Sequence, residues 1–366
     1  MDSVDVPRSR SDRLSACDRP TRARAGGSIC DELTRWVHGC LLPTIPGPQV
    51  PEALRPLLAD GLGGVILFAR SITSRTQLTG LTSALRAEAP DLLVATDEEG
   101  GDVTRLEAAT GSSYPGNRAL GRVDDTTLTT RVAAALGADL ATTGINLALA
   151  PVADVQSDPR SPVIGVRPFG SDPALVARHT AAYVTGVQST GVAACAKHLP
   201  GHGATELDSH RELPVVSADR ALLEQRDLPP FRAAIEAGVQ TVMSAHVVYP
   251  ALDVAPATLS RRILTDLVRD DLGFTGAVLT DALGMAAISE TVGVEAGAVQ
   301  ALAAGADLLC LDLDLAGTLA VRDAVLASVH NGQLPADRVA EAAGAYGRCS
   351  CRPGRIQKRC GTARSG

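Results

Sequence analysis

Short runs of apolar residues recur along the whole chain, and longer segments with helical spacing separate them. Each run holds six to eight residues that are rich in Val, Leu, Ile and Ala, whereas segments such as residues 128–143 and 173–190 repeat Ala and Leu about every three or four positions. Apolar strands that alternate with amphipathic helices indicate a parallel sheet whose outer face is covered by helices. The predicted strands are residues 39–45, 64–69, 92–97, 145–152, 192–198, 240–247, 276–281 and 306–312.

Eight strand-then-helix units predict an α/β fold, a single (β/α)8 TIM barrel, although a doubly wound open sheet would give a similar rhythm. Polar residues gather where the predicted strands end. In a barrel these strand ends meet at one face, where active sites form, whereas an open sheet spreads them along an edge. The polar residues at the strand ends are Asp97, Glu98, Glu99, Asp154, Lys197, His198, His246, Asp281 and Asp312.

The two ends of the chain differ from its body in composition and charge. Residues 1–30 and 347–366 are rich in Arg, Ser, Pro, Gly and Cys, and we expect them to form disordered or irregular tails. The tails carry net charges of +2 and +6, so residues 31–346 carry −15 of the total of −7. We therefore expect residues 31–346 to be one catalytic domain that repels nucleic acid and anionic membranes.

Amino-acid composition argues against two classes of binding protein and indicates the cellular compartment. Aromatic residues make up only 2% of the chain, which argues against a stacking platform for nucleic acid and against an aromatic-rich carbohydrate-binding sandwich. The N-terminal segment lacks the apolar core of a secretory signal, and no run reaches transmembrane length. Cys40, Cys195 and Cys310 each lie in an apolar run, as expected for buried free thiols in a reducing compartment. We expect a cytoplasmic monomer.

The stretch from Lys197 to His210, KHLPGHGATELDSH, concentrates ionisable side chains in a glycine-broken loop. Asp208 and His210 lie two residues apart, so in an extended segment they share a face and can form a proton-transfer pair. The alternative is that these two side chains are exposed to solvent and have no chemical role. A metal site is disfavoured because the histidines lack metal-binding spacing.

Three further sites carry charged residues at the predicted mouth. Asp281 ends the run AVLTD, where it can be a nucleophile at the rim or the N-cap of a helix that begins in DALGMAAI. The acidic segment that starts at Asp97 can accept hydrogen bonds from sugar hydroxyls or form a plain turn. Arg167, in a loop broken by Pro and Gly, reaches the mouth or forms a surface ion pair.

Taken together, these motifs resemble one family. KHLPGHGATELDSH and DEEGGDVTRL, followed by IGVRPFG, SAHVVYPALD and VLTDALGM in order, are similar to the glycoside hydrolase family 3 β-N-acetylglucosaminidases of the NagZ type, over about residues 31–330. The resemblance implies a TIM barrel and a retaining double displacement in which Asp281 is the nucleophile and His210 the acid/base, with Asp208 as its partner. It implies that the terminal sugar is held by Asp97, Arg105, Arg167, Lys197 and His198.

The resemblance therefore implies hydrolysis of terminal, non-reducing β-linked N-acetylglucosamine from muropeptides in peptidoglycan recycling, with no cofactor and no metal. Two departures are Glu98, where many relatives have Gln, and GSSYPGN at residues 111–117, which differs from the expected F-P segment. Phosphorolysis of the same glycosides and β-glucosidase activity are alternatives within the family. A metal-dependent amidohydrolase and a non-catalytic sugar-binding protein are alternatives from other classes.

Overall fold

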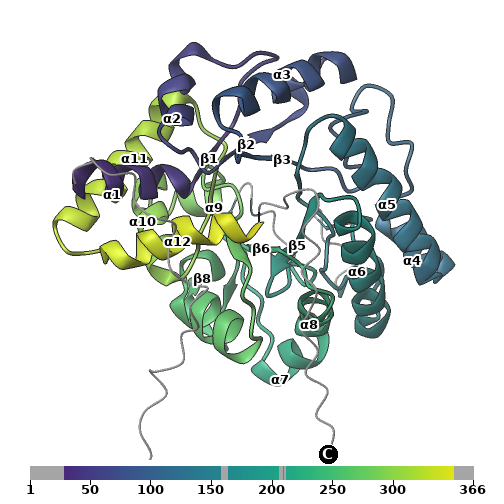
Figure 1. Cartoon of the computed structure of the whole chain (residues 1–366). Helices are drawn as coiled ribbons and strands as arrows, with labels where there is room; N and C mark the ends of the chain where they lie inside the picture. The colour runs from purple at the N-terminus through teal and green to yellow at the C-terminus, as the bar shows by residue number, and fades with distance from the viewer. Residues whose placement is uncertain (1–28, 158–163, 206–208, 210–211, 350–366) are drawn as a thin grey trace, which may run out of the picture.

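A computed structural model describes residues 29–157, 164–205, 209 and 212–349 (Figure 1). Eight parallel strands lie within or next to the eight predicted runs, so that prediction is confirmed. A six-stranded sheet has the order β2-β3-β4-β5-β6-β9, and β1 pairs with β10. These strands are β1 (Leu41–Pro43), β2 (Gly64–Leu67), β3 (Leu93–Thr96), β4 (Leu147–Ala148), β5 (Ala193–Leu199), β6 (Thr241–Ser244), β9 (Ala277–Thr280) and β10 (Leu309–Leu311).

The parallel sheet is curled, and isolated bridges link its two parts. Thr44, just after β1, bridges to Ile66 in β2, and Leu279 in β9 bridges to Leu308, just before β10. The chain therefore has an α/β fold with a curled parallel sheet, and the closed eight-stranded barrel stays a prediction. One antiparallel hairpin, β7 (Val248–Tyr249) with β8 (Asp253–Pro256), was not predicted from the sequence because each of its strands is short.

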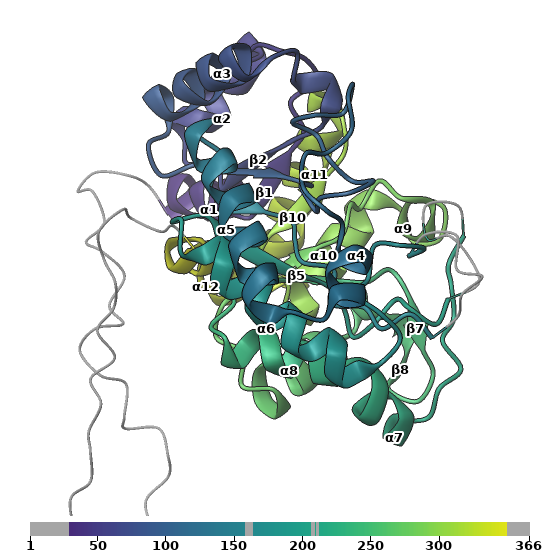
Figure 2. The same cartoon turned by 90° about the vertical axis from the view of Figure 1, so that its right-hand side faces the viewer.

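Helices cover the outside of the sheet. Seen at right angles, α5, α6 and α8 lie side by side over one part of it (Figure 2). Aspartates and a serine begin several helices: Ser74, Asp125, Asp172 and Asp314 each accept a hydrogen bond from a backbone N–H of the first turn. The helices are α1 (Ile29–Gly39), η2 (Glu52–Leu54), α2 (Arg55–Ala59), η3 (Ala69–Ser71), α3 (Arg75–Glu88), α4 (Asn117–Val123), α5 (Thr126–Thr142), α6 (Pro173–Gln188), α7 (Arg220–Leu222), η4 (Leu223–Asp227), α8 (Leu228–Glu236), η5 (Ala257–Leu259), η6 (Arg262–Asp271), α9 (Ala286–Ser289), α10 (Val294–Ala304), α11 (Leu315–His330) and α12 (Ala336–Cys349).

The predicted boundary of the body is slightly too narrow. Helix α1 begins at Ile29 and α12 ends at Cys349, so regular structure starts two residues before and ends three residues after the predicted limits of 31–346. The rest of both predicted tails lies outside the described residues. Among the described residues, no helix combines the length and the apolar character that crossing a membrane requires.

The strands are buried on both faces, which explains why they read as unbroken apolar runs. In β3, Val94 packs into the layer between sheet and helices, whereas Leu93 and Ala95 pack inside the curled sheet. Cys195 and Cys310 belong to the inner layer, and together with Cys40 they are buried free thiols, as the sequence predicted. The filled interior leaves the carboxyl ends of the strands as the place for a site.

Candidate active site

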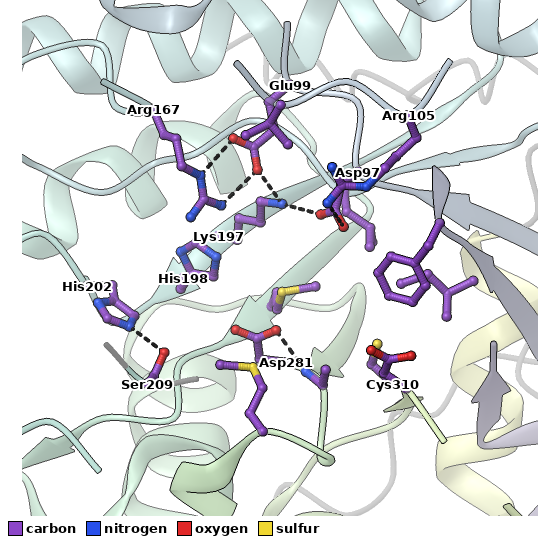
Figure 3. A pocket seen from close by; sticks show the side chains of 18 residues that line it. Asp97, Glu99, Arg105, Arg167, Lys197, His198, His202, Ser209, Asp281 and Cys310 are labelled. Carbon is purple, nitrogen blue, oxygen red and sulfur yellow. Dashed lines mark hydrogen bonds and ion pairs between the residues drawn. The ribbon is translucent and has the colours of Figure 1, made fainter. Parts of the chain in front are cut away.

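A cavity of about 260 Å³ opens at the carboxyl ends of the strands. Asp97 follows β3, Lys197 and His198 belong to β5, and Asp281 follows β9 (Figure 3). Strand ends that are far apart in the sequence therefore meet, as predicted. The charged residues, histidines and serine that line the cavity are Asp97, Glu99, Arg105, Arg167, Lys197, His198, His202, Ser209, Asp281 and Asp312. The apolar wall includes Ile66, Phe68, Met243 and Met285.

A network of ion pairs forms one wall of the cavity. The Lys197 Nζ lies 2.7 Å from a carboxylate oxygen of Asp97 and 2.7 Å from one of Glu99. Arg167 donates from Nε and Nη2 to Glu99 at 3.0 and 2.8 Å, and Arg105 Nη2 lies 3.4 Å from Asp97. Glu99 thus joins two cations. The sequence pointed to its acidic segment but did not select Glu99, because neighbouring carboxylates cannot be told apart before the fold is known.

The network keeps Glu99 and Lys197 charged at neutral pH. Burial alone would raise the pKa of the Glu99 carboxyl, but the charges of Lys197 and Arg167 lower it well below its usual range. Burial would lower the pKa of Lys197, but Asp97 and Glu99 raise it above its ordinary value. The wall therefore presents fixed hydrogen-bond donors and acceptors, which suits a ligand with several hydroxyls.

We expect the Lys197→Met substitution to lower the free energy of unfolding by roughly 3 kcal/mol, because it removes the ammonium group that pairs with the buried carboxylate of Glu99 and the half-buried carboxylate of Asp97. Urea unfolding monitored by circular dichroism measures this. The double variant Lys197→Met/Glu99→Gln should lose clearly less stability than the sum of the two single variants. Strict additivity would contradict the coupling of these two side chains.

Asp281 lies across the cavity from this network (Figure 3). Its Oδ1 accepts a hydrogen bond from the backbone N–H of Ala282 at 2.8 Å. Burial would raise the pKa of its carboxyl, but His198 and His246 lower it to about 2. The alternative role as a helix cap is wrong, because α9 begins at Ala286 and no side chain caps it. An ionised, partly exposed carboxylate at this place is suited to nucleophilic attack.

The His198 ring is held from behind by a carboxylate. Asp154 Oδ2 lies 2.8 Å from His198 Nδ1, and Asp154 Oδ1 accepts from the backbone N–H groups of His198 at 3.2 Å and of His202 at 2.6 Å. Asp154 is fully buried, and although burial raises the pKa of its carboxyl, the charge of His198 lowers it below the ordinary value. A carboxylate at Nδ1 places the proton on that nitrogen and leaves Nε2 for the cavity. The sequence placed Asp154 at a strand end without assigning it a role.

We expect the Asp154→Asn substitution to raise KM roughly ten-fold with a smaller effect on kcat, because losing a hydrogen bond to a charged partner is worth about 1.5 kcal/mol. Steady-state kinetics and the pH profile of kcat/KM check this, with the exposed Asp91→Asn as the matched control. A KM equal to that of the control would show that Asp154 does not orient His198.

The start of the Lys197–His210 loop is well anchored. His202 is buried, its Nδ1 lies 2.8 Å from Thr205 Oγ1, and its Nε2 lies 3.0 Å from Ser209 Oγ. Burial and the neighbouring His198 lower the pKa of His202 to about 4, so the ring is neutral and holds the loop through Thr205 and Ser209. The predicted pair Asp208 and His210 lies outside the described residues. Ser209 between them lines the cavity.

The described residues offer no cluster of three or more His, Cys, Asp or Glu side chains that could hold a metal ion.

Comparison with known proteins gives one consistent family. Residues 46–345 match the Glycosyl hydrolase family 3 N terminal domain. A β-hexosaminidase from Nitrosomonas eutropha is 39% identical over 291 residues, which cover 77% of this chain and 83% of that protein. β-Hexosaminidase A from Pseudoalteromonas piscicida is 37% identical over 285 residues, 72% of this chain but only 48% of that protein. The chain thus spans about half the length of the second relative.

Solved structures agree. A glycoside hydrolase family 3 β-N-acetylglucosaminidase from Paenibacillus sp. str. FPU-7 superposes with a TM-score of 0.84 and 39% identity, covering 90% of this chain and 65% of that one. NagZ from Neisseria gonorrhoeae, in complex with N-trifluoroacetyl-D-glucosamine, gives a TM-score of 0.73 and 32% identity, covering 85% and 90% of the two chains.

Proposed function

Because the chain belongs to glycosyl hydrolase family 3, within its β-hexosaminidase branch, we propose that it is a retaining β-N-acetylglucosaminidase. It removes terminal, non-reducing β-linked N-acetylglucosamine from its substrate. The observation that carries the proposal is the placement of the ionised Asp281 carboxylate in one cavity with the Lys197-centred network. We further propose that the substrates are muropeptides released during peptidoglycan recycling, and that the protein acts as a cytoplasmic monomer.

We also propose that the eight parallel strands close into a (β/α)8 barrel in the order β1-β2-β3-β4-β5-β6-β9-β10. The pairing of β1 with β10 and the bridges Thr44–Ile66 and Leu279–Leu308 support this order. A closed ring brings all eight strand ends to one mouth, which is the arrangement that a sugar-sized site needs.

The proposed reaction has two steps at the anomeric carbon. The Asp281 carboxylate attacks this carbon and forms a glycosyl ester, while protonated His210 gives its proton to the leaving oxygen. Neutral His210 then accepts a proton from water, whose oxygen attacks the same carbon and releases Asp281. Two inversions retain the β configuration. Asp208 orients the His210 ring in both steps.

The ion-pair wall holds the sugar. The carboxylate of Asp97 and the cations Lys197, Arg105 and Arg167 provide acceptors and donors for adjacent hydroxyls, and His198 offers Nε2. Because these groups are already paired with one another, they need little rearrangement when the sugar binds.

The decisive experiment is to trap the glycosyl ester. A 5-fluoro-N-acetylglucosaminyl donor should inactivate the protein, and mass spectrometry should place one sugar on the peptide that contains Asp281. An adduct on another carboxylate would overturn the assignment of the nucleophile. Turnover of a nitrophenyl N-acetylglucosaminide with and without phosphate separates hydrolysis from phosphorolysis, since only phosphorolysis yields the sugar 1-phosphate.

Acid stability offers a separate check on the carboxylates. Because the folded pKa of Asp281 is lowered from 3.8 to about 2, its ionised form stabilises the fold above pH 4, and this contribution disappears as the pH falls through about 2. Between pH 4.5 and pH 2, the free energy of unfolding of Asp281→Asn should therefore decline less steeply than that of the unmodified protein. The difference in slope should correspond to at most one proton taken up on unfolding. Thermal unfolding over this range measures the slopes, and equal slopes would contradict the lowered pKa.

A further inference from the structure

A second cavity, of about 280 Å³, borders the candidate active site. The two cavities share Glu99, Val103 and Arg167. The far wall of the second cavity comes from helix α4, which contributes Asn117, Arg118 and Arg122. Neither the motifs nor the proposed reaction gives these three residues a role.

This wall carries two arginines, Arg118 and Arg122. Arg118 and Arg122 are four residues apart on α4, so their side chains lie on one face of the helix. Within the described part of the chain neither forms an ion pair, since Arg118 donates only from Nη2, to Gln156 Oε1 and to the Gly165 carbonyl. Burial and the charge of Arg122 lower the pKa of Arg118. An anion between the two guanidinium groups would relieve this repulsion.

The remaining charges of the cavity do not supply this anion. Glu99 is already bound by Lys197 and Arg167, and Asp102 lies exposed at the edge without an ion pair to a described residue. The site is therefore an arginine pair that lines a cavity and has no ion-pair partner among the described residues.

Two buried polar atoms of the same wall have no hydrogen bond. They are Arg118 Nε and Asn117 Oδ1, and neither has a partner among the described residues. Asn117 is 2% exposed, and its Nδ2 donates to the Arg167 carbonyl, which leaves Oδ1 as a free acceptor. Buried polar atoms without partners are rare and point to a missing ligand. A buried donor and a buried acceptor on this wall fit a group that carries both oxyanion oxygens and a hydroxyl.

We propose that this second cavity is an anion-binding subsite, in which Arg118 and Arg122 bind a phosphate or carboxylate group and Asn117 Oδ1 accepts a hydrogen bond from a hydroxyl group of the ligand. The anion is either free in solution or a substituent of the terminal sugar, which reaches the cavity past Arg167. The second source rests on the proposed function, whereas the anion site itself does not.

Titration with inorganic phosphate at constant ionic strength tests the site. We expect phosphate to bind with a millimolar Kd, which calorimetry and thermal-shift assays measure. The single variant Arg122→Gln and the double variant Arg118→Gln/Arg122→Gln should each weaken phosphate binding at least five-fold. Arg131→Gln, an exposed arginine on α5, is the matched control and should leave the Kd unchanged. Because Arg122 is itself exposed, its variant should fold normally. No phosphate binding, or an equal Kd in the double variant, would overturn the proposal.

Inhibition by two sugars separates the sources of the anion. If the anion belongs to the sugar, N-acetylglucosamine 6-phosphate should inhibit at least five-fold more strongly than N-acetylglucosamine, and this advantage should vanish in Arg118→Gln/Arg122→Gln. Equal inhibition together with phosphate binding would assign the site to a free anion. If neither sugar binds while phosphate does, the proposed function fails and the anion site stands.

Discussion

Replacing Asp281 by asparagine should lower kcat/KM for a nitrophenyl N-acetylglucosaminide by at least about 10,000-fold. The other described carboxylates that line the cavity are each held in an ion pair, Asp97 and Glu99 with Lys197 and Asp312 with Arg70. Asparagine keeps the size of the side chain and can still accept from the N–H of Ala282. The loss therefore reports the missing negative charge at the anomeric carbon rather than a change of shape. Stopped assays with purified protein measure the residual rate.

The matched control for this variant is Asp270→Asn, which removes an exposed carboxylate at the end of η6. It should leave kcat/KM within about two-fold of the original, because an exposed charge far from the mouth is screened by water and salt. Circular dichroism should show that both variants are folded. Turnover by Asp281→Asn close to that of the control would remove Asp281 from the mechanism.

The fold followed from the sequence more completely than the site did. Strands such as β2 and β9 are buried at every position, so apart from Thr280 their residues are apolar or glycine and the runs are visible without an alignment. The hairpin of β7 and β8 was missed because Val248–Tyr249 is too short to show a period. The alternative role of Asp281 as a helix N-cap was wrong, because the chain turns after Asp281 and α9 begins only at Ala286.

Sequence order predicted which edge of the sheet carries the chemistry, but not which side chains touch. Lys197 and Asp97 are 100 residues apart, and they meet only because β3 and β5 flank β4. The selection of Asp97 rather than Glu99 as the acidic member was therefore incomplete, since Glu99 binds both Lys197 and Arg167. Asp154 behaved likewise: its position at a strand end was clear, whereas its contact with His198 required the register of the strands.

The cations at the mouth of the sheet stand out against the negative net charge of the domain. Residues 31–346 carry −15, and Lys197 is one of only two lysines in the chain, yet it is buried at the mouth beside two arginines. Burial without a partner would lower the pKa of an ammonium group until it lost its charge, but Asp97 and Glu99 raise the pKa of Lys197. Such an arrangement is costly to build, and it is expected where a ligand must be positioned rather than where a fold needs stability.

The His210→Ala substitution should lower kcat/KM about 1,000-fold for substrates with a poor leaving group, such as an alkyl or sugar aglycone, because the leaving oxygen then departs without a proton. A dinitrophenyl glycoside, whose leaving group needs no proton, should lose far less in the first step. A plot of log kcat/KM against the pKa of the leaving group should therefore become steeper in the variant. The exposed Glu212→Gln, two residues further along, is the matched control and should keep the original slope. Azide should restore turnover of the dinitrophenyl glycoside by replacing activated water in the second step. A uniform loss across all leaving groups, without rescue by azide, would show that His210 positions the substrate and that the acid/base lies elsewhere.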